Sequence, residues 1–81
     1  MMRQQKLRYI CTAQWLHDTQ GPPRKAYRLN VLDASGEKPR LLCAVNDVCG
    51  SESRARQLEA LLRRNQVSPK HVMDVLEDWL P

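Results

Sequence analysis

Residues 68–81 constrain the fold of this 81-residue chain more than any other stretch. Ser68 followed by Pro69 is typical of a helix start, because a serine oxygen can cap free backbone N–H groups and proline at the first helical position loses no hydrogen bond. The apolar residues that follow recur at the spacing of one helical face: Val72, Val75, Leu76, Trp79 and Leu80. A helix of about a dozen residues is marginal in water on its own, so the rest of the chain must cover this face.

A second helix is expected directly before the final one. Either Ser51 or Ser53 can cap a helix that ends near Asn65. Its apolar stripe consists of Ala55, Leu58, Leu61 and Leu62. Residues 65–67 then turn the chain, so residues 51–81 are predicted to form a helical hairpin.

The charges on the first of these helices are arranged for ion pairs. Glu52 stands four residues before Arg56, and Glu59 stands four residues before Arg63. With the acid nearer the N-terminus, this spacing favours pairing along the helix surface. We therefore expect both arginines to be paired within their own helix.

The first half of the chain has the pattern of β-strands. Apolar residues occupy every second position in residues 7–15 and 26–32, and residues 41–45 form a short apolar run. Gly21, Pro22 and Pro23 end the first strand, and residues 33–36 have the composition of a tight turn. Neighbouring strands in sequence usually pair, so residues 7–45 are predicted to form an antiparallel β-meander.

These elements predict one small α+β domain over residues 1–81, a three-stranded antiparallel β-meander with a C-terminal two-helix hairpin packed on one face. Tyr9, Trp15 and Tyr27 fall on the strand positions that the helices would bury. Ile10 and Leu16 fall on the other face and interrupt its polar pattern, so part of that face can also be covered. The polar positions of this outer face are Arg8, Thr12, Gln14, Arg28 and Asn30.

The small size allows only one modest core, so self-association, for example as a homodimer, is one way to gain stability. The chain lacks both a run of about 18 apolar residues and the uninterrupted apolar region of a secretory signal. Cys11, Cys43 and Cys49 are odd in number and lack a CxxC spacing, which favours buried reduced thiols over disulfides. We therefore expect a cytoplasmic protein without contact to membranes.

Motifs for catalysis or for a cofactor are missing. The glycines are dispersed and form no phosphate-binding loop, and no nucleophile elbow or paired-ligand zinc helix occurs. A Cys–His nucleophile pair, or a zinc site built from the thiols with His17 or His71, is formally possible, but the spacing gives neither any support. We expect no enzymatic activity, no cofactor and no metal.

The final helix ends in an acidic surface. The formal net charge is +4, but residues 70–81 hold one lysine against three acids, a local charge of −2. His71, Asp74 and Asp78 lie along one strip, where a metal is conceivable and a surface role is favoured. Glu77 and Asp78 stand in the last turn, where the helix dipole disfavours anions. They either meet arginines of the same molecule or bind a basic partner or a second copy, so the candidate binding residues are His71, Asp74, Glu77 and Asp78.

The outer face of the predicted sheet is basic. Its candidate binding residues are Lys6, Arg8, Arg28 and Arg40. A cluster of cations can contact phosphates, but readers of single strands usually add aromatic side chains on the same face. The aromatic residues of this chain fall on the buried face instead, which makes nucleic acid the less favoured partner.

The closing segment also resembles that of a known family. Residues 61–81 read LLRRNQVSPKHVMDVLEDWLP, which is similar to the pattern N-x-x-S/T-P-x-H-L-x-D-V/I-x-x-D/E-F/Y of small uncharacterised proteins from clostridial-type bacteria. Val72 stands where leucine is usual and Trp79 where phenylalanine or tyrosine is. The matching residues are Asn65, Val67, Ser68, Pro69, His71, Asp74, Val75 and Asp78. The resemblance implies a β-meander followed by two helices, and it implies no activity, cofactor or partner.

The sequence therefore favours a small, non-enzymatic protein-interaction or regulatory module, with an unidentified protein partner or a second copy bound at the acidic helix end. The alternative is a nucleic-acid-binding module that uses the basic sheet face.

Overall fold

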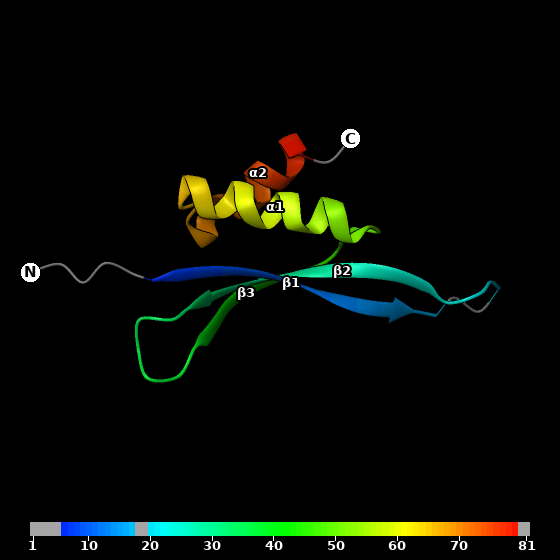
Figure 1. The fold of residues 1–81 in the computed structure, drawn as a ribbon, viewed down its shortest axis with the longest axis horizontal. Coiled ribbons are helices and arrows are strands. Elements are labelled where there is room, and N and C mark those ends of the chain that lie inside the picture. The colour runs from blue at the N-terminus through cyan, green and yellow to red at the C-terminus, as the bar shows by residue number, and fades with distance from the viewer. Residues whose placement is uncertain (1–5, 18–19, 80–81) are drawn as a thin grey trace, which may run out of the picture.

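The computed structural model describes residues 6–17 and 20–79, and it confirms the predicted fold class (Figure 1). A three-stranded antiparallel meander of strand order β1-β2-β3 is followed by two C-terminal helices, and α1 packs on the sheet. The elements in chain order are β1 (Leu7–Leu16), β2 (Arg24–Asp33), β3 (Arg40–Cys49), α1 (Glu52–Asn65), the 3₁₀ turn η1 (Pro69–His71) and α2 (Val72–Trp79). Within the described residues, no helix is long and apolar enough to span a membrane.

The third strand is longer than the predicted residues 41–45, because it continues through a bulge. Leu29 of β2 pairs with Val45 and Tyr27 pairs with Cys49, so β3 has additional residues at this point. Asp47 lies in the bulge at a φ of 56°, a left-handed conformation that aspartate tolerates better than most residues. Beyond the bulge, the side chain of Val48 points back into the core, where it is 3% exposed.

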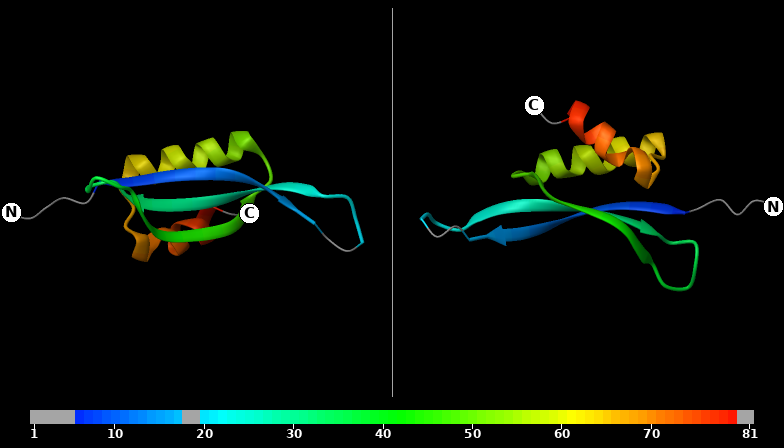
Figure 2. Two further views of the ribbon diagram at one scale, coloured as in Figure 1. Left: turned by 90° about the horizontal axis from the view of Figure 1, so that it is seen from below. Right: turned by 180° about the vertical axis from the view of Figure 1, so that it is seen from behind.

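The core lies between the sheet and the helices. Its fully buried side chains come from β2, α1 and α2, and the largest are Leu29, Leu58, Leu62, Leu76, Val31 and Val72. Figure 2 shows α1 and α2 on the same side of the sheet, with α1 over β1. The predicted apolar stripe of the last helix is therefore buried or packed against the core as far as Trp79, and Leu80 lies outside the described residues.

The burial predicted for Trp15 is wrong. Its side chain is 63% exposed, although it occupies the same strand parity as the buried Tyr9 and Cys11. The end of the β1–β2 hairpin extends beyond α1, so no helix lies over this part of the sheet (Figure 1). Strand parity fixes the face to which a side chain points, but the length of the covering helix decides whether that side chain is buried.

The two helix starts differ in how they are capped. Ser51 caps α1 as expected, since its hydroxyl oxygen accepts a hydrogen bond of 3.1 Å from the backbone N–H of Arg54. The prediction that the Ser68 side chain caps the last helix is wrong, because this side chain makes no capping hydrogen bond. The chain begins there with a 3₁₀ turn, in which the carbonyl of Ser68 accepts from the N–H of His71 at 2.9 Å.

Two long-range contacts fasten the helices. The hydroxyl of Tyr9 in β1 donates a hydrogen bond to the carbonyl of Val67, in the turn between the helices. The guanidinium of Arg54 lies over the ring of Trp79, 4.3 Å from its centre, and so connects α1 to α2. The first contact holds the turn between the helices to β1, and the second holds the two helices together.

Candidate functional site

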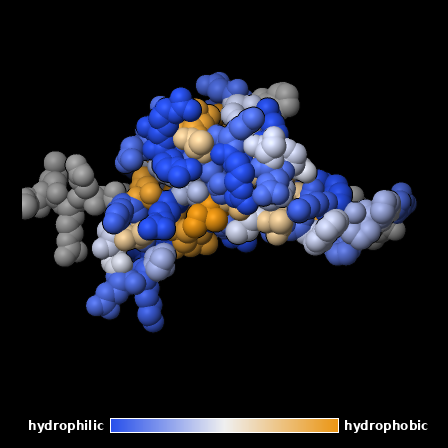
Figure 3. All heavy atoms as spheres, viewed as in Figure 1, coloured by the Kyte–Doolittle hydropathy of each residue, from blue (hydrophilic) through white to orange (hydrophobic). Residues whose placement is uncertain are grey.

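The sheet face opposite the helices bears apolar side chains that the described part of the chain leaves uncovered. Ile10 is 40% exposed and Leu41 is 50% exposed, and both lie with Leu32 around a shallow cavity of about 530 Å³. In Figure 2, seen from below, no helix crosses this face. Figure 3 views the molecule from the side and shows apolar surface at the level of the sheet beneath α1. We call this cavity the sheet hollow. Its lining residues are Ile10, Thr12, Ala13, Gln14, Arg28, Asn30, Leu32 and Leu41.

The polar groups of the sheet hollow are unevenly satisfied. The side-chain amide of Asn30 donates to the carbonyl of Ile10 at 3.0 Å and to the hydroxyl of Thr12 at 3.1 Å. The Nε atom of Arg28, in contrast, is buried and has no hydrogen-bond partner. A buried N–H without an acceptor is unfavourable. No acidic residue is among those lining the hollow.

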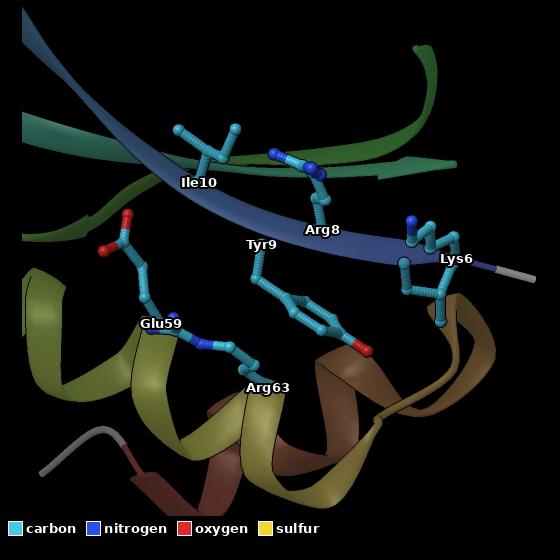
Figure 4. Close-up of a pocket in the computed structure, with 7 residues that line it drawn as sticks. Lys6, Arg8, Tyr9, Ile10, Glu59 and Arg63 are labelled. Atoms are coloured by element: carbon cyan, nitrogen blue, oxygen red, sulfur yellow. The ribbon is translucent and has the colours of Figure 1, made fainter. Parts of the chain in front are cut away.

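A second cavity, of about 410 Å³, lies along the outer edge of β1 beside α1 (Figure 4). We call it the edge groove. Arg8 and Ile10 point to one side of β1 in this view, whereas Tyr9 points toward the helices. Glu59 points from α1 toward the strand, and the side chain of Arg63 runs along α1 toward Glu59. The residues that line the groove are Lys6, Leu7, Arg8, Tyr9, Ile10, Glu59 and Arg63.

The helix α1 occupies part of this strand edge directly. A carboxylate oxygen of Glu59 accepts a hydrogen bond of 2.6 Å from the backbone N–H of Cys11, and Arg56 donates to the carbonyl of Cys11 at 3.4 Å. Arg56 also pairs with Glu59 at 2.8 Å and lies 3.9 Å from Glu52. The predicted pair of Glu59 with Arg63 is therefore wrong, because the Glu59 carboxylate turns to the strand edge.

The basic residues predicted as one binding face line different cavities, although Arg8 and Arg28 stay on the same side of the sheet. Lys6 and Arg8 line the edge groove, and Arg28 lines the sheet hollow. Arg40 lines neither cavity and lies opposite Asp33 in the register of β2 and β3. Hydrogen bonds from Ser35 lower the pKa of Asp33, and the charge of Arg40 contributes to this shift. The structure therefore separates the four predicted residues into different environments.

The acidic end of α2 is exposed. His71 lies 3.6 Å from the carboxylate of Asp74, a contact that becomes an ion pair when the histidine is protonated. Neither Glu77 nor Asp78 makes an ion pair with any residue that the structure describes. Over the described ranges, no three histidine, cysteine or acidic side chains are grouped as a metal site.

All three cysteines are free thiols. Burial raises the pKa of Cys11 to about 11, and the negative charge of nearby Glu59 and the neighbouring Cys49 add to the shift. Burial also raises the pKa of Cys43. A nucleophilic cysteine needs a lowered pKa, so the surroundings of these two thiols favour the neutral, unreactive form.

Several residues that line these cavities are not among the predicted site residues. Ile10 interrupts the polar pattern of β1, and this interruption is the local sequence signal for the sheet hollow. The sequence assigns Leu41 to a strand without a face, because residues 41–45 form a nearly continuous apolar run. Arg63 was expected in an ion pair with Glu59, and nothing local in the sequence indicates that Glu59 binds Cys11.

The fold and its cavities define a small α+β domain with an uncovered, partly apolar sheet face. Residues 1–81 match the model of a family described as a family of unknown function (DUF6514), and the chain belongs to that family. No curated protein and no solved structure matches the chain. The function therefore has to be argued from the surfaces themselves.

Proposed function

We propose that this protein is a non-enzymatic protein-interaction module that docks a partner protein on its sheet hollow. The observation that carries the proposal is the uncovered apolar floor of the hollow, where Ile10 is 40% and Leu41 50% exposed on a face that no helix covers. Exposed apolar side chains that line one cavity on a small domain are typical of binding sites. Burying such side chains in an interface is favourable by about 25 cal/mol per Å² of apolar area.

The charges of this face favour a partner that carries carboxylates. Arg28 lines the hollow with a cationic side chain and no acid among the lining residues, and Arg8 lies on the same side of the sheet. A second copy placed here by a two-fold axis would bring like charges together, with no acid in the hollow to neutralise them. A different protein, with apolar side chains and a carboxylate aimed at Arg28, fits better than self-association.

Nucleic acid is the weaker candidate for the same face. The floor of the hollow is apolar, and the cations Arg8 and Arg28 line different cavities. Tyr9 and Tyr27 are 8% and 3% exposed on the opposite face, so they offer no stacking platform for bases. Strong binding to nucleic acid would need several cations in one row that contact successive phosphates.

The remaining features agree with this proposal. The neutral, buried Cys11 suits a reducing compartment, and we place the protein in the bacterial cytoplasm. We also take the clostridial-type family with the closing pattern of Ser68, His71 and Asp74 to be the family matched by the whole chain. In that assignment, the acidic end of α2 is a second, solvent-exposed surface.

The test compares the capture of partners by matched variants. Leu41→Asp places a charge in the hollow, whereas Met73→Asp makes the same change on α2 at a residue that is equally exposed, at 53%. The wild type and both variants are immobilised and incubated with lysate of the source organism, and bound proteins are quantified by mass spectrometry. We expect at least one protein to bind the wild type and Met73→Asp and to lose about tenfold or more with Leu41→Asp.

Circular dichroism of each variant checks that it is folded before capture. Identical capture profiles for all three proteins would contradict docking in the hollow. If the protein captured through the hollow were a second copy of this chain, the proposal that the partner is a different protein would be contradicted.

A further inference from the structure

We propose that the edge of β1 at Leu7 and Tyr9 receives an extended acidic segment of the partner, which adds to the sheet as a fourth strand. This inference rests on the proposed protein-interaction function and names the partner's binding mode. The edge groove and the sheet hollow share Ile10, so a strand bound in the groove would border the hollow directly.

The backbone groups of this edge point outward. The N–H and C=O of Cys11 both contact side chains of α1, so they face away from β2. The carbonyl of Lys6 accepts from the N–H of Ala34, which shows that the residues between the outward ones face β2. Backbone direction alternates along a strand, so Leu7 and Tyr9 point outward like Cys11. No side chain in the described ranges bonds to their outward groups.

The contact at Cys11 already shows what this edge binds. Glu59 supplies an acceptor oxygen to the N–H of Cys11, and Arg56 supplies a donor to its carbonyl. A neighbouring strand would present the same two groups, a carbonyl oxygen and an N–H. The pair from α1 thus closes the edge at Cys11 and leaves it open at Tyr9 and Leu7, where the groove lies.

The charges around the groove select an acidic segment. Lys6, directly before β1, and Arg8, within β1, line the groove on one side. Arg63 lines it from α1. The acid among the lining residues, Glu59, is already engaged with Cys11 and Arg56. Side chains of an added strand point alternately to the two sides, so its carboxylates meet a cation on either side.

The other edge of the sheet is less suited to strand addition. The bulge in β3 places Asp47 at a φ of 56°, and Asp47 pairs with Arg24 at 2.8 Å. Bulges bend and twist an edge and so interrupt regular pairing. The regular edge beside Tyr9 is therefore the better template.

The test is a selection of displayed random linear peptides on the full-length chain, followed by NMR mapping of the amide shifts caused by each enriched peptide. We expect acidic peptides that shift the amides of Leu7 and Tyr9. Their affinity should fall about tenfold with Arg63→Glu and stay unchanged with Arg64→Glu, since Arg64 is the adjacent arginine on α1 and does not line the groove. Methylation of alternate peptide nitrogens should abolish binding in one register and leave it in the other.

Two outcomes overturn the inference. One outcome is peptides that shift the amide signals of Asn30 and Leu41 and bind the Arg63→Glu variant with the same affinity as the wild type. This result would contradict strand addition and support docking in the sheet hollow. A selection that enriches no peptide would also overturn strand addition, and the Leu41→Asp capture experiment would then decide the proposed function separately.

Discussion

Tyr9 shows how one side chain can join distant parts of the chain. Its ring is buried beneath the helices, and its hydroxyl donates to the carbonyl of Val67. Tyr9→Phe keeps the ring but leaves that carbonyl without its donor. We expect the free energy of unfolding in urea to fall by about 1 to 2 kcal/mol.

Tyr27→Phe is the matched control for Tyr9→Phe. Tyr27 is also buried, at 3% exposure, but its hydroxyl makes no hydrogen bond within the described residues. Its removal should change stability far less. Equal losses for the two variants would contradict the role assigned to the Tyr9 hydroxyl.

Cys11 is expected to make the free energy of unfolding fall at alkaline pH. The pKa of its thiol is about 11 in the folded protein, against an ordinary value of 9.0, because burial disfavours the thiolate. Since the folded state holds the proton more tightly, this contribution is fully present below pH 9 and is lost as the pH rises toward 11.

We expect urea unfolding to show that the wild type loses roughly 1 to 3 kcal/mol more than Cys11→Ala between these pH values. Tyr9, whose pKa is also raised, titrates in both proteins, so the difference between them isolates Cys11. Parallel pH profiles for the two proteins would contradict the assignment.

At the scale of elements, the edge of β1 is closed at Cys11 by helix α1. Glu59→Gln weakens the acceptor for the N–H of Cys11 and removes the ion pair with Arg56. We expect chemical denaturation to show a loss of about 1 to 3 kcal/mol, because a partly buried charged hydrogen bond is replaced by a neutral one.

Glu52→Gln is the control on the same helix. Glu52 also lies near Arg56, at 3.9 Å, but its side chain is 67% exposed and makes no hydrogen bond to a strand residue in the described part of the chain. Exposed pairs of this kind contribute about 0 to 1 kcal/mol. If the two glutamates gave equal losses, Glu59 would have no special role at the strand edge.

Local patterns predicted the elements because each one depends on neighbouring residues. Periodicity predicted the three strands and both helices, although β3 is longer than predicted. Of the two serines predicted as possible caps, Ser51 begins α1. The errors came from contacts between elements. Trp15 is exposed because α1 does not reach it, and Glu59 leaves Arg63 for the distant N–H of Cys11. Such outcomes depend on helix length and packing, which spacing along the chain does not encode.

At the scale of the whole molecule, the uneven charge of the sequence corresponds to separate surfaces. The acids Glu77 and Asp78 lie on α2. The cations Lys6 and Arg8 line the edge groove, and Arg28 lines the sheet hollow. The sequence predicted a wet basic face, but the structure adds an apolar floor to it. Leu41 joins that floor only because β3 folds back beside β2.

The central claim is that the uncovered sheet face docks another protein, and photocrosslinking in living cells tests it most directly. A benzophenone amino acid replaces Leu41 in the sheet hollow or Met73 on α2, two positions of similar exposure at 50% and 53%. After irradiation, we predict that position 41 forms a crosslink to another protein and that position 73 forms none. The account would be contradicted if neither position gave a product, or if both gave the same one.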